Sequence, residues 1–279
     1  MKLFDTHVHI GHSPITQKEL LQLTRKAKAS KTVLLSQAPD RGYMSQADRV
    51  AYNAARLQQM IELTENSNEL LPVHFINVIE EDAATQVDAA LQAGVIGFKV
   101  ICANHYPGDD RAMPVYQKIA QAGLPVLFHS GILWGFGENA AYNRPGNFEA
   151  LLHVPGLRFA LAHIGWPWCD EMIAVFGKFL SMRSSEHYTG QEMYIDLTPG
   201  TPPIYRQEAL TKLLTVGYPG MEQRLLFGSD CFTDRYAPEH VQEWVNRDKA
   251  IYESLKLEQQ AQNAIFYDNA MAFWGQATS

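Results

Sequence analysis

Residues Lys2–His9 read K-L-F-D-T-H-V-H, an apolar run that finishes with two histidines two positions apart. On an extended strand successive side chains alternate between the two faces, so Asp5, His7 and His9 share one face. Imidazole nitrogens suit zinc and similar divalent ions, and two imidazoles at this spacing can reach the same ion. The segment therefore predicts an opening β-strand that ends in a metal-binding pair. The alternative is a strand that carries two surface histidines.

Seven further short apolar runs follow, and nearly all of the eight precede a stretch with helical spacing. Strands that alternate with helices form right-handed parallel units, and eight such units predict a closed (β/α)8 barrel, an α/β fold of the TIM type. An open doubly wound sheet is the alternative, but the sequence lacks a glycine-rich phosphate turn. The seven later runs are 32–36, 72–79, 95–101, 125–129, 157–163, 193–197 and 224–227.

Length and composition agree with one soluble enzyme-sized unit. A chain of 279 residues suits a barrel of about 250 residues, and no linker or repeat divides it, so residues 1–279 are expected to form a single domain. The net charge of −7 without a dense Lys/Arg run argues against a nucleic-acid partner and leaves a small-molecule substrate. The oligomeric state stays open.

Cysteine usage and hydropathy bear on the compartment. Three scattered cysteines, Cys102, Cys169 and Cys231, do not form a disulfide framework and favour a reducing environment. The N-terminus lacks an apolar signal core, and no stretch has the roughly 18 apolar residues needed to cross a bilayer. A cytoplasmic protein without a membrane partner is the expectation.

Ligand-type side chains gather at the ends of the predicted strands. Active sites of such barrels lie at the carboxyl ends of the strands. Taken singly, the later histidines could be core residues, Asp230 could cap a turn, and a buried Lys99 would need a partner for its charge. Their common position favours a site. The residues at these ends are His7, His9, Lys99, His129, His163 and Asp230.

These motifs, in this order, resemble the amidohydrolase superfamily. They are D-T-H-V-H at the start, a histidine after strand five, A-H-I-G-W-P after strand six, F-G-S-D after strand eight and a closing N-A-x-x-F segment. The chain is most similar to the amidohydrolase-2 branch, which includes metal-dependent hydrolases of lactones and amides and non-oxidative decarboxylases of the aminocarboxymuconate-semialdehyde type. The resemblance covers nearly the whole chain.

The resemblance implies one divalent metal ion, usually zinc, surrounded by His7, His9, His129 and Asp230. His163 would act on the substrate or the bound water, and Asp230 would also move the water's proton. Lys99 lies near the position where two-metal branches carry a carboxylated lysine, so a second ion stays an alternative. We expect one ion, with Lys99 facing the substrate.

The function expected from the resemblance is hydrolysis of a small lactone, amide or ester by a metal-activated water. Non-oxidative decarboxylation of a small carboxylic acid is the alternative, and a non-catalytic metal-binding barrel is the least favoured reading. Beside His7, Asp5 is expected to orient a ligand imidazole. Lys99, Arg144 and Trp166 are candidate substrate contacts. Other arginines and aromatic residues of the predicted loops are weaker candidates: Arg41, Arg111, Arg235, Trp134, Phe136 and Trp168.

Overall fold

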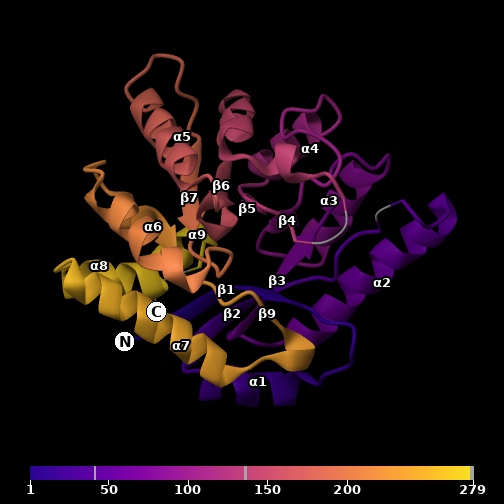
Figure 1. Cartoon of the computed structure of the whole chain (residues 1–279). Helices are drawn as coiled ribbons and strands as arrows, with labels where there is room; N and C mark the ends of the chain where they lie inside the picture. The colour runs from indigo at the N-terminus through magenta and orange to yellow at the C-terminus, as the bar shows by residue number, and fades with distance from the viewer. Residues whose placement is uncertain (41, 135–136, 277–279) are drawn as a thin grey trace.

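The computed structural model describes residues 1–40, 42–134 and 137–276, and its centre is a curled parallel sheet (Figure 1). The strands follow the order β8-β7-β6-β5-β4-β3-β2-β1-β9, so β1 to β8 lie side by side in chain order and β9 lies beside β1. The strands are β1 (Leu3–His9), β2 (Ala29–Leu35), β3 (Leu70–Phe75), β4 (Phe98–Val100), β5 (Val126–Phe128), β6 (Arg158–Leu161), β7 (Glu192–Asp196), β8 (Leu225–Leu226) and β9 (Cys231–Phe232).

Residues 225–232 close the barrel. The first part of this segment, β8, pairs with β7, and its last part, β9, pairs with β1. Between them, the Phe227 carbonyl accepts a hydrogen bond from the Thr6 amide at 3.1 Å. Residues 225–232 thus act as one interrupted eighth strand, and the predicted (β/α)8 barrel is confirmed.

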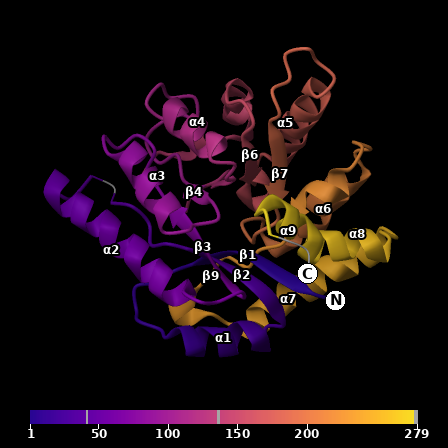
Figure 2. The ribbon, with the colours of Figure 1, turned by 180° about the vertical axis from the view of Figure 1, so that it is seen from behind.

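Helices cover the outside of the sheet, as opposite views show (Figures 1 and 2). The first begins with a capping box, because the Thr16 side chain and Glu19 satisfy each other's backbone amides. None of the helices in the described residues is long and apolar enough to cross a membrane. The α-helices are α1 (Gln17–Lys26), α2 (Gln46–Thr64), α3 (Ala83–Gln92), α4 (Met113–Gln121), α5 (Cys169–Met182), α6 (Pro203–Thr215), α7 (Pro238–Ser254), α8 (Gln259–Asn263) and α9 (Asn269–Phe273).

The connection between β5 and β6 differs from the α-helix that the strand–helix alternation leads us to expect there. Two 3-10 segments, Ala140–Asn143 and Pro145–His153, stand in its place. Pro145 and Gly146 open the second segment, and these two residue types are the weakest helix formers.

The C-terminal helix seals the amino-terminal end of the barrel. Met271, Phe273 and Trp274 of this region are buried and join the cluster of inward-facing strand side chains. Trp274 lies so close to Gly97, just before β4, that a Cβ on this glycine would come within 2.5 Å of its ring. Since all strands are parallel, their carboxyl ends meet at the other end of the barrel, and that end stays open to polar side chains.

Candidate metal centre

Three ligand atoms converge where β1 meets the end of the eighth strand. His7 Nε2 lies 3.2 Å from His9 Nε2. Asp230 Oδ1 lies 3.6 Å from the first of these nitrogens and 3.4 Å from the second. Tetrahedral coordination with bonds of about 2.0–2.1 Å separates neighbouring ligand atoms by roughly 3.3 Å. The spacing of the three atoms therefore fits a divalent ion between them.

His163 adds a further imidazole beside these atoms. One ligand atom each from His7, His163 and Asp230 lie within 4.8 Å of one another. Nδ1 of His163 is buried and has no hydrogen-bond partner among the described residues. An unpartnered buried nitrogen is costly, and a metal ion or a substrate atom would satisfy it.

His129 lies beside this group. Its ring centroid is 4.8 Å from that of His163, and it lines the same cavity as His7 and Asp230. Its Nε2 is 3.2 Å from the Ile132 carbonyl, so this nitrogen carries the proton and donates it. The structure thus brings His129 to the site but groups His163 more tightly with His7 and Asp230, and the ligand role of His129 stays a prediction.

Asp196, at the end of β7, orients the ring of His7. Its Oδ2 accepts a hydrogen bond from His7 Nδ1 at 2.7 Å, while the Thr198 amide donates to Oδ1 at 2.6 Å. With Nδ1 protonated, the lone pair of Nε2 points to the metal position, which is the usual arrangement of ligand histidines. Sequence reasoning missed Asp196, although it lies near the carboxyl end of a predicted strand, 193–197, as the other site residues do.

The predicted role of Asp5 is wrong. Its carboxylate accepts hydrogen bonds from the amide and hydroxyl of Ser229 at 2.8 and 2.7 Å and from the Tyr236 hydroxyl at 3.1 Å. None of the described imidazoles forms a hydrogen bond with it. On β1 the strand pleat places Asp5 one level below His7, where it faces the turn after the eighth strand. Asp5 therefore holds the turn that presents Asp230.

Strained backbone conformations occur at the site. Asp230, His163 and Ile164 have φ values of +59°, +63° and +54°, in the left-handed region that residues with a Cβ rarely adopt. Such outliers persist only where the surroundings hold them, and they cluster at functional sites. Gly200 supports this geometry, because a Cβ there would lie 2.5 Å from Cβ of His163. Only glycine allows the β7–α6 loop to approach this imidazole so closely.

The electrostatics favour the neutral form of three of the imidazoles. Burial lowers the pKa of His7, His129 and His163, and the nearby Lys99 lowers each further. Burial also lowers the pKa of Lys99 to about 8, against the opposing effect of Asp196 and Asp230. For Asp230, burial raises the pKa, but the hydrogen bond to His9 and the neighbouring imidazoles outweigh it and the pKa lies well below its ordinary value. Neutral imidazoles and an ionised carboxylate are the protonation states that bind metal ions.

These residues line one cavity of about 350 Å³, called the metal pocket below, which opens at the carboxyl ends of the strands. Lys99 is buried on its wall, with Nζ 3.4 Å from His7 Nε2. The other site residues on the wall are His9, His129, His163 and Asp230, and Trp134, Phe75 and Phe232 supply aromatic surface.

The remaining predicted substrate contacts fare differently. Arg144 binds Glu171 at 2.7 Å and does not line the metal pocket, so its role as a substrate contact stays a prediction without support from this geometry. Trp166 also lies outside the lining, but its ring stacks against that of Trp134, which lines the pocket, at 6.1 Å, and its substrate role stays a prediction. Arg41 and Phe136 lie outside the described residues.

The comparisons with known proteins agree with this site. A sequence model of the amidohydrolase family, Amidohydro_2, matches residues 4–276, and the chain belongs to that family. Among curated proteins, no sequence matches it.

Several solved structures share the fold. A structure described as amidohydrolase II superposes with a TM-score of 0.70 at 16% identity, covering 98% of this chain and 100% of that one. The apo form of the Metarhizium anisopliae IDCase gives 0.65 at 13% identity, with 98% and 97% covered. Dihydroorotase from Campylobacter jejuni gives 0.59 at 14% identity, with 100% and 84% covered. At such identities these likenesses establish the fold alone.

Proposed function

We propose that this protein is a metal-dependent hydrolase that cleaves a small lactone, amide or ester. The observation that carries the proposal is the convergence of His7, His9 and Asp230 on one point, with the unpartnered His163 nitrogen beside it. One divalent ion, with zinc as the preferred metal for a nitrogen-rich set, fits these donors. When bound, such an ion supplies Lewis acidity and lowers the pKa of water toward neutrality.

The side chains divide the remaining work between them. Asp230 is an ionised carboxylate with about a third of its surface exposed, so it can accept the proton of the attacking water and return it to the leaving group. His163 and Lys99 face the same pocket and can donate hydrogen bonds to the oxygen on which negative charge develops. Asp196 and Asp5 hold His7 and the Asp230 turn in place and do not touch the substrate.

The test is a screen of the zinc-loaded protein against lactones, amides and carboxylated aromatic acids, with acid release and carbon dioxide followed separately. Hydrolysis that His163→Ala abolishes while metal content persists supports the proposal. His240→Ala is the matched control, because this exposed histidine of α7 binds Trp244 and lies outside the metal pocket. Carbon dioxide release without hydrolysis would assign the decarboxylase alternative. Loss of the ion in His163→Ala would make His163 a ligand and favour a two-metal site with Lys99.

A further inference from the structure

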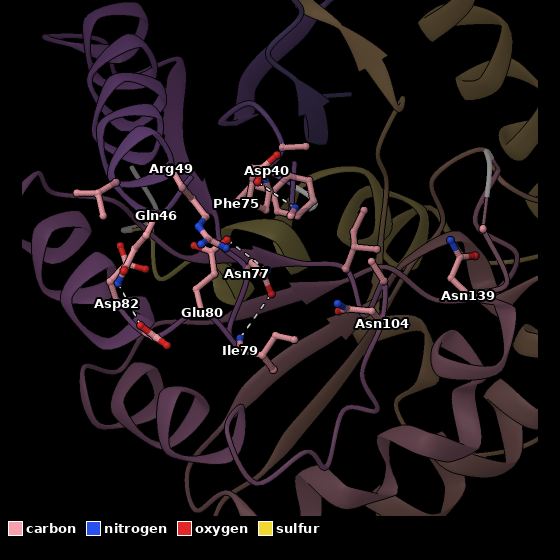
Figure 3. Close-up of a pocket in the computed structure, with 18 residues that line it drawn as sticks. Asp40, Gln46, Arg49, Phe75, Asn77, Ile79, Glu80, Asp82, Asn104 and Asn139 are labelled. Atoms are coloured by element: carbon pink, nitrogen blue, oxygen red, sulfur yellow. Dashed lines mark hydrogen bonds between the residues drawn. The ribbon is translucent and has the colours of Figure 1, made fainter. Parts of the chain in front are cut away.

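A second cavity adjoins the metal pocket over the carboxyl ends of β2, β3 and β4. It has a volume of about 470 Å³ and is called the side cavity below (Figure 3). Ala38, Phe75 and Ile101 line both cavities, so the two adjoin along this shared wall. A ligand that passes Phe75 and Ile101 would reach from the metal pocket into the side cavity across an apolar section.

The far part of the side cavity is polar. Arg49 points into it from α2 and lies on the same side as Asn77, while Asn104 and Asn139 lie on the other side (Figure 3). The three amides offer both donors and acceptors, and the guanidinium offers five donors. This chemistry suits an anionic or strongly polar end of a ligand rather than an alkyl chain.

Arg49 is set apart from other arginines of this face. No side chain in residues 1–40, 42–134 and 137–276 forms a hydrogen bond or ion pair with its guanidinium. In contrast, Arg111 binds Asp109 at 2.7 Å and Arg144 binds Glu171 at 2.7 Å. Glu80, labelled near Arg49 in Figure 3, accepts hydrogen bonds from side-chain amides instead.

These amides hold Glu80 through both of its oxygens. Asn53 and Gln86 donate to Oε2 at 3.0 and 2.8 Å, and Asn77 donates to Oε1 at 3.2 Å. The carboxylate is thereby fixed without Arg49, and the planar donor fork of the arginine stays available to a ligand.

We propose that the side cavity is the subsite for a carboxylate at the end of the substrate remote from the bond that is cleaved. Arg49 would bind this group through two parallel hydrogen bonds, the geometry for which guanidinium is suited. Since the cavity adjoins the metal pocket, the inference rests on the proposed function and names its substrate class as an acid with a cleavable group at its other end.

The charges around the side cavity indicate which kind of anionic group it would bind. Among the described residues, four acidic side chains line the side cavity along with Arg49: Asp40, Glu80, Glu81 and Asp82. Their repulsion grows with each negative charge on the ligand, so a singly charged carboxylate is accommodated better than a doubly charged phosphate or phosphonate.

The test is calorimetric titration of the zinc-loaded full chain with linear dicarboxylates from glutarate to suberate. Each is compared with the monocarboxylate of equal length. One carboxylate can occupy the metal pocket in both ligand series, so the difference reports the second. We expect at least one dicarboxylate to bind about tenfold more tightly than its matched monocarboxylate, because the half-buried guanidinium adds a charge-assisted hydrogen-bond pair. The corresponding phosphonocarboxylate should bind more weakly than that dicarboxylate.

Variants separate the contribution of Arg49 from nonspecific effects. Arg49→Gln should abolish the tenfold difference, Arg49→Lys should keep part of it, and Arg111→Gln, a loop arginine outside both cavities, should retain it in full. No difference in wild type, or a difference that survives Arg49→Gln, would overturn the proposal. Metal content and the hydrolysis screen are measured separately. If the protein binds zinc and hydrolyses esters but gains no affinity from the second carboxylate, the subsite proposal is wrong and the proposed function stands.

Discussion

The two ends of the barrel are built from the same strands but differ in almost every physical respect. At the amino-terminal end, Phe273 and Trp274 pack with inward-facing strand residues such as Phe4 into an apolar cluster. At the carboxyl end, buried groups are polar, the His163 Nδ1 nitrogen has no partner among the described residues, and the Asp230 backbone is in the left-handed region. The apolar packing of the amino-terminal end stabilises the fold. The unpartnered nitrogen and the strained backbone of the carboxyl end destabilise it but hold the reactive side chains in place. Changes at the two ends should accordingly affect different measurements.

The largest effect is expected from Asp230→Asn at the open end. The amide retains the shape of the carboxylate but cannot take up the proton of the attacking water, so turnover should fall by about 10²–10⁴-fold. The rate constant is measured with zinc in excess and with the metal content of each preparation determined. Turnover within a factor of a few of wild type at equal metal content would remove Asp230 from proton transfer.

At the sealed end, Phe273→Ala should destabilise the fold by about 3–5 kcal/mol, because it leaves a cavity beside Tyr194, whose ring lies 5.0 Å away. Urea unfolding gives the free energy, and the folded fraction should still bind metal as wild type does. Ala272→Ser, at the exposed neighbouring position, is the control with almost no expected change. If Phe273→Ala kept normal stability but lost metal, the two ends of the barrel would not have the separate roles described here.

A moderate effect is expected for Asp196→Asn, which keeps the shape of the side chain but removes the charge that supports His7. Zinc affinity, measured by competition with a chelating dye, should drop about 10–100-fold, the usual result for partners of ligand histidines. Asp170→Asn is the matched control, since this carboxylate is 75% exposed on α5. Equal affinities for the two variants would argue against the orienting role of Asp196.

The smallest effect concerns His74 in β3, outside both cavities. Burial lowers its pKa to about 3, whereas the unfolded chain has a pKa near 6.5. Between these values the unfolded state binds a proton that the folded state rejects, so stability is lost as the pH falls below 6.5, by at most about 1.4 kcal/mol per pH unit. His74→Asn should flatten this dependence in urea unfolding of the metal-free protein between pH 7 and 5. An unchanged slope would show that other groups cause it.

Sequence patterns anticipated what depends on local order along the chain. Alternating strands and helices predicted the barrel, and the position of Asp230 after an apolar run predicted that it would meet His7. The contacts made across the fold could not be read in this way. Asp196 binds a histidine 189 positions away, and Arg144 finds Glu171 on another element. Asp5 was assigned to the correct region but to the wrong partner, because the strand pleat gives the face of a side chain and not its height relative to a neighbouring turn.

The side cavity shows the same limit. Arg49 belongs to a helix with ordinary amphipathic spacing, and nothing in its local sequence distinguishes it from a surface arginine. Only the folded chain shows that it faces a hollow beside the metal pocket while Glu80 is held by amide groups.

The central claim is that the open end binds one divalent ion through the β1 histidines, and elemental analysis of the purified protein tests it most directly. The account predicts about one mole of metal per mole of wild-type chain after zinc is supplied at neutral pH, and far less in His7→Ala. A wild-type protein that retains neither zinc nor manganese under these conditions would contradict it.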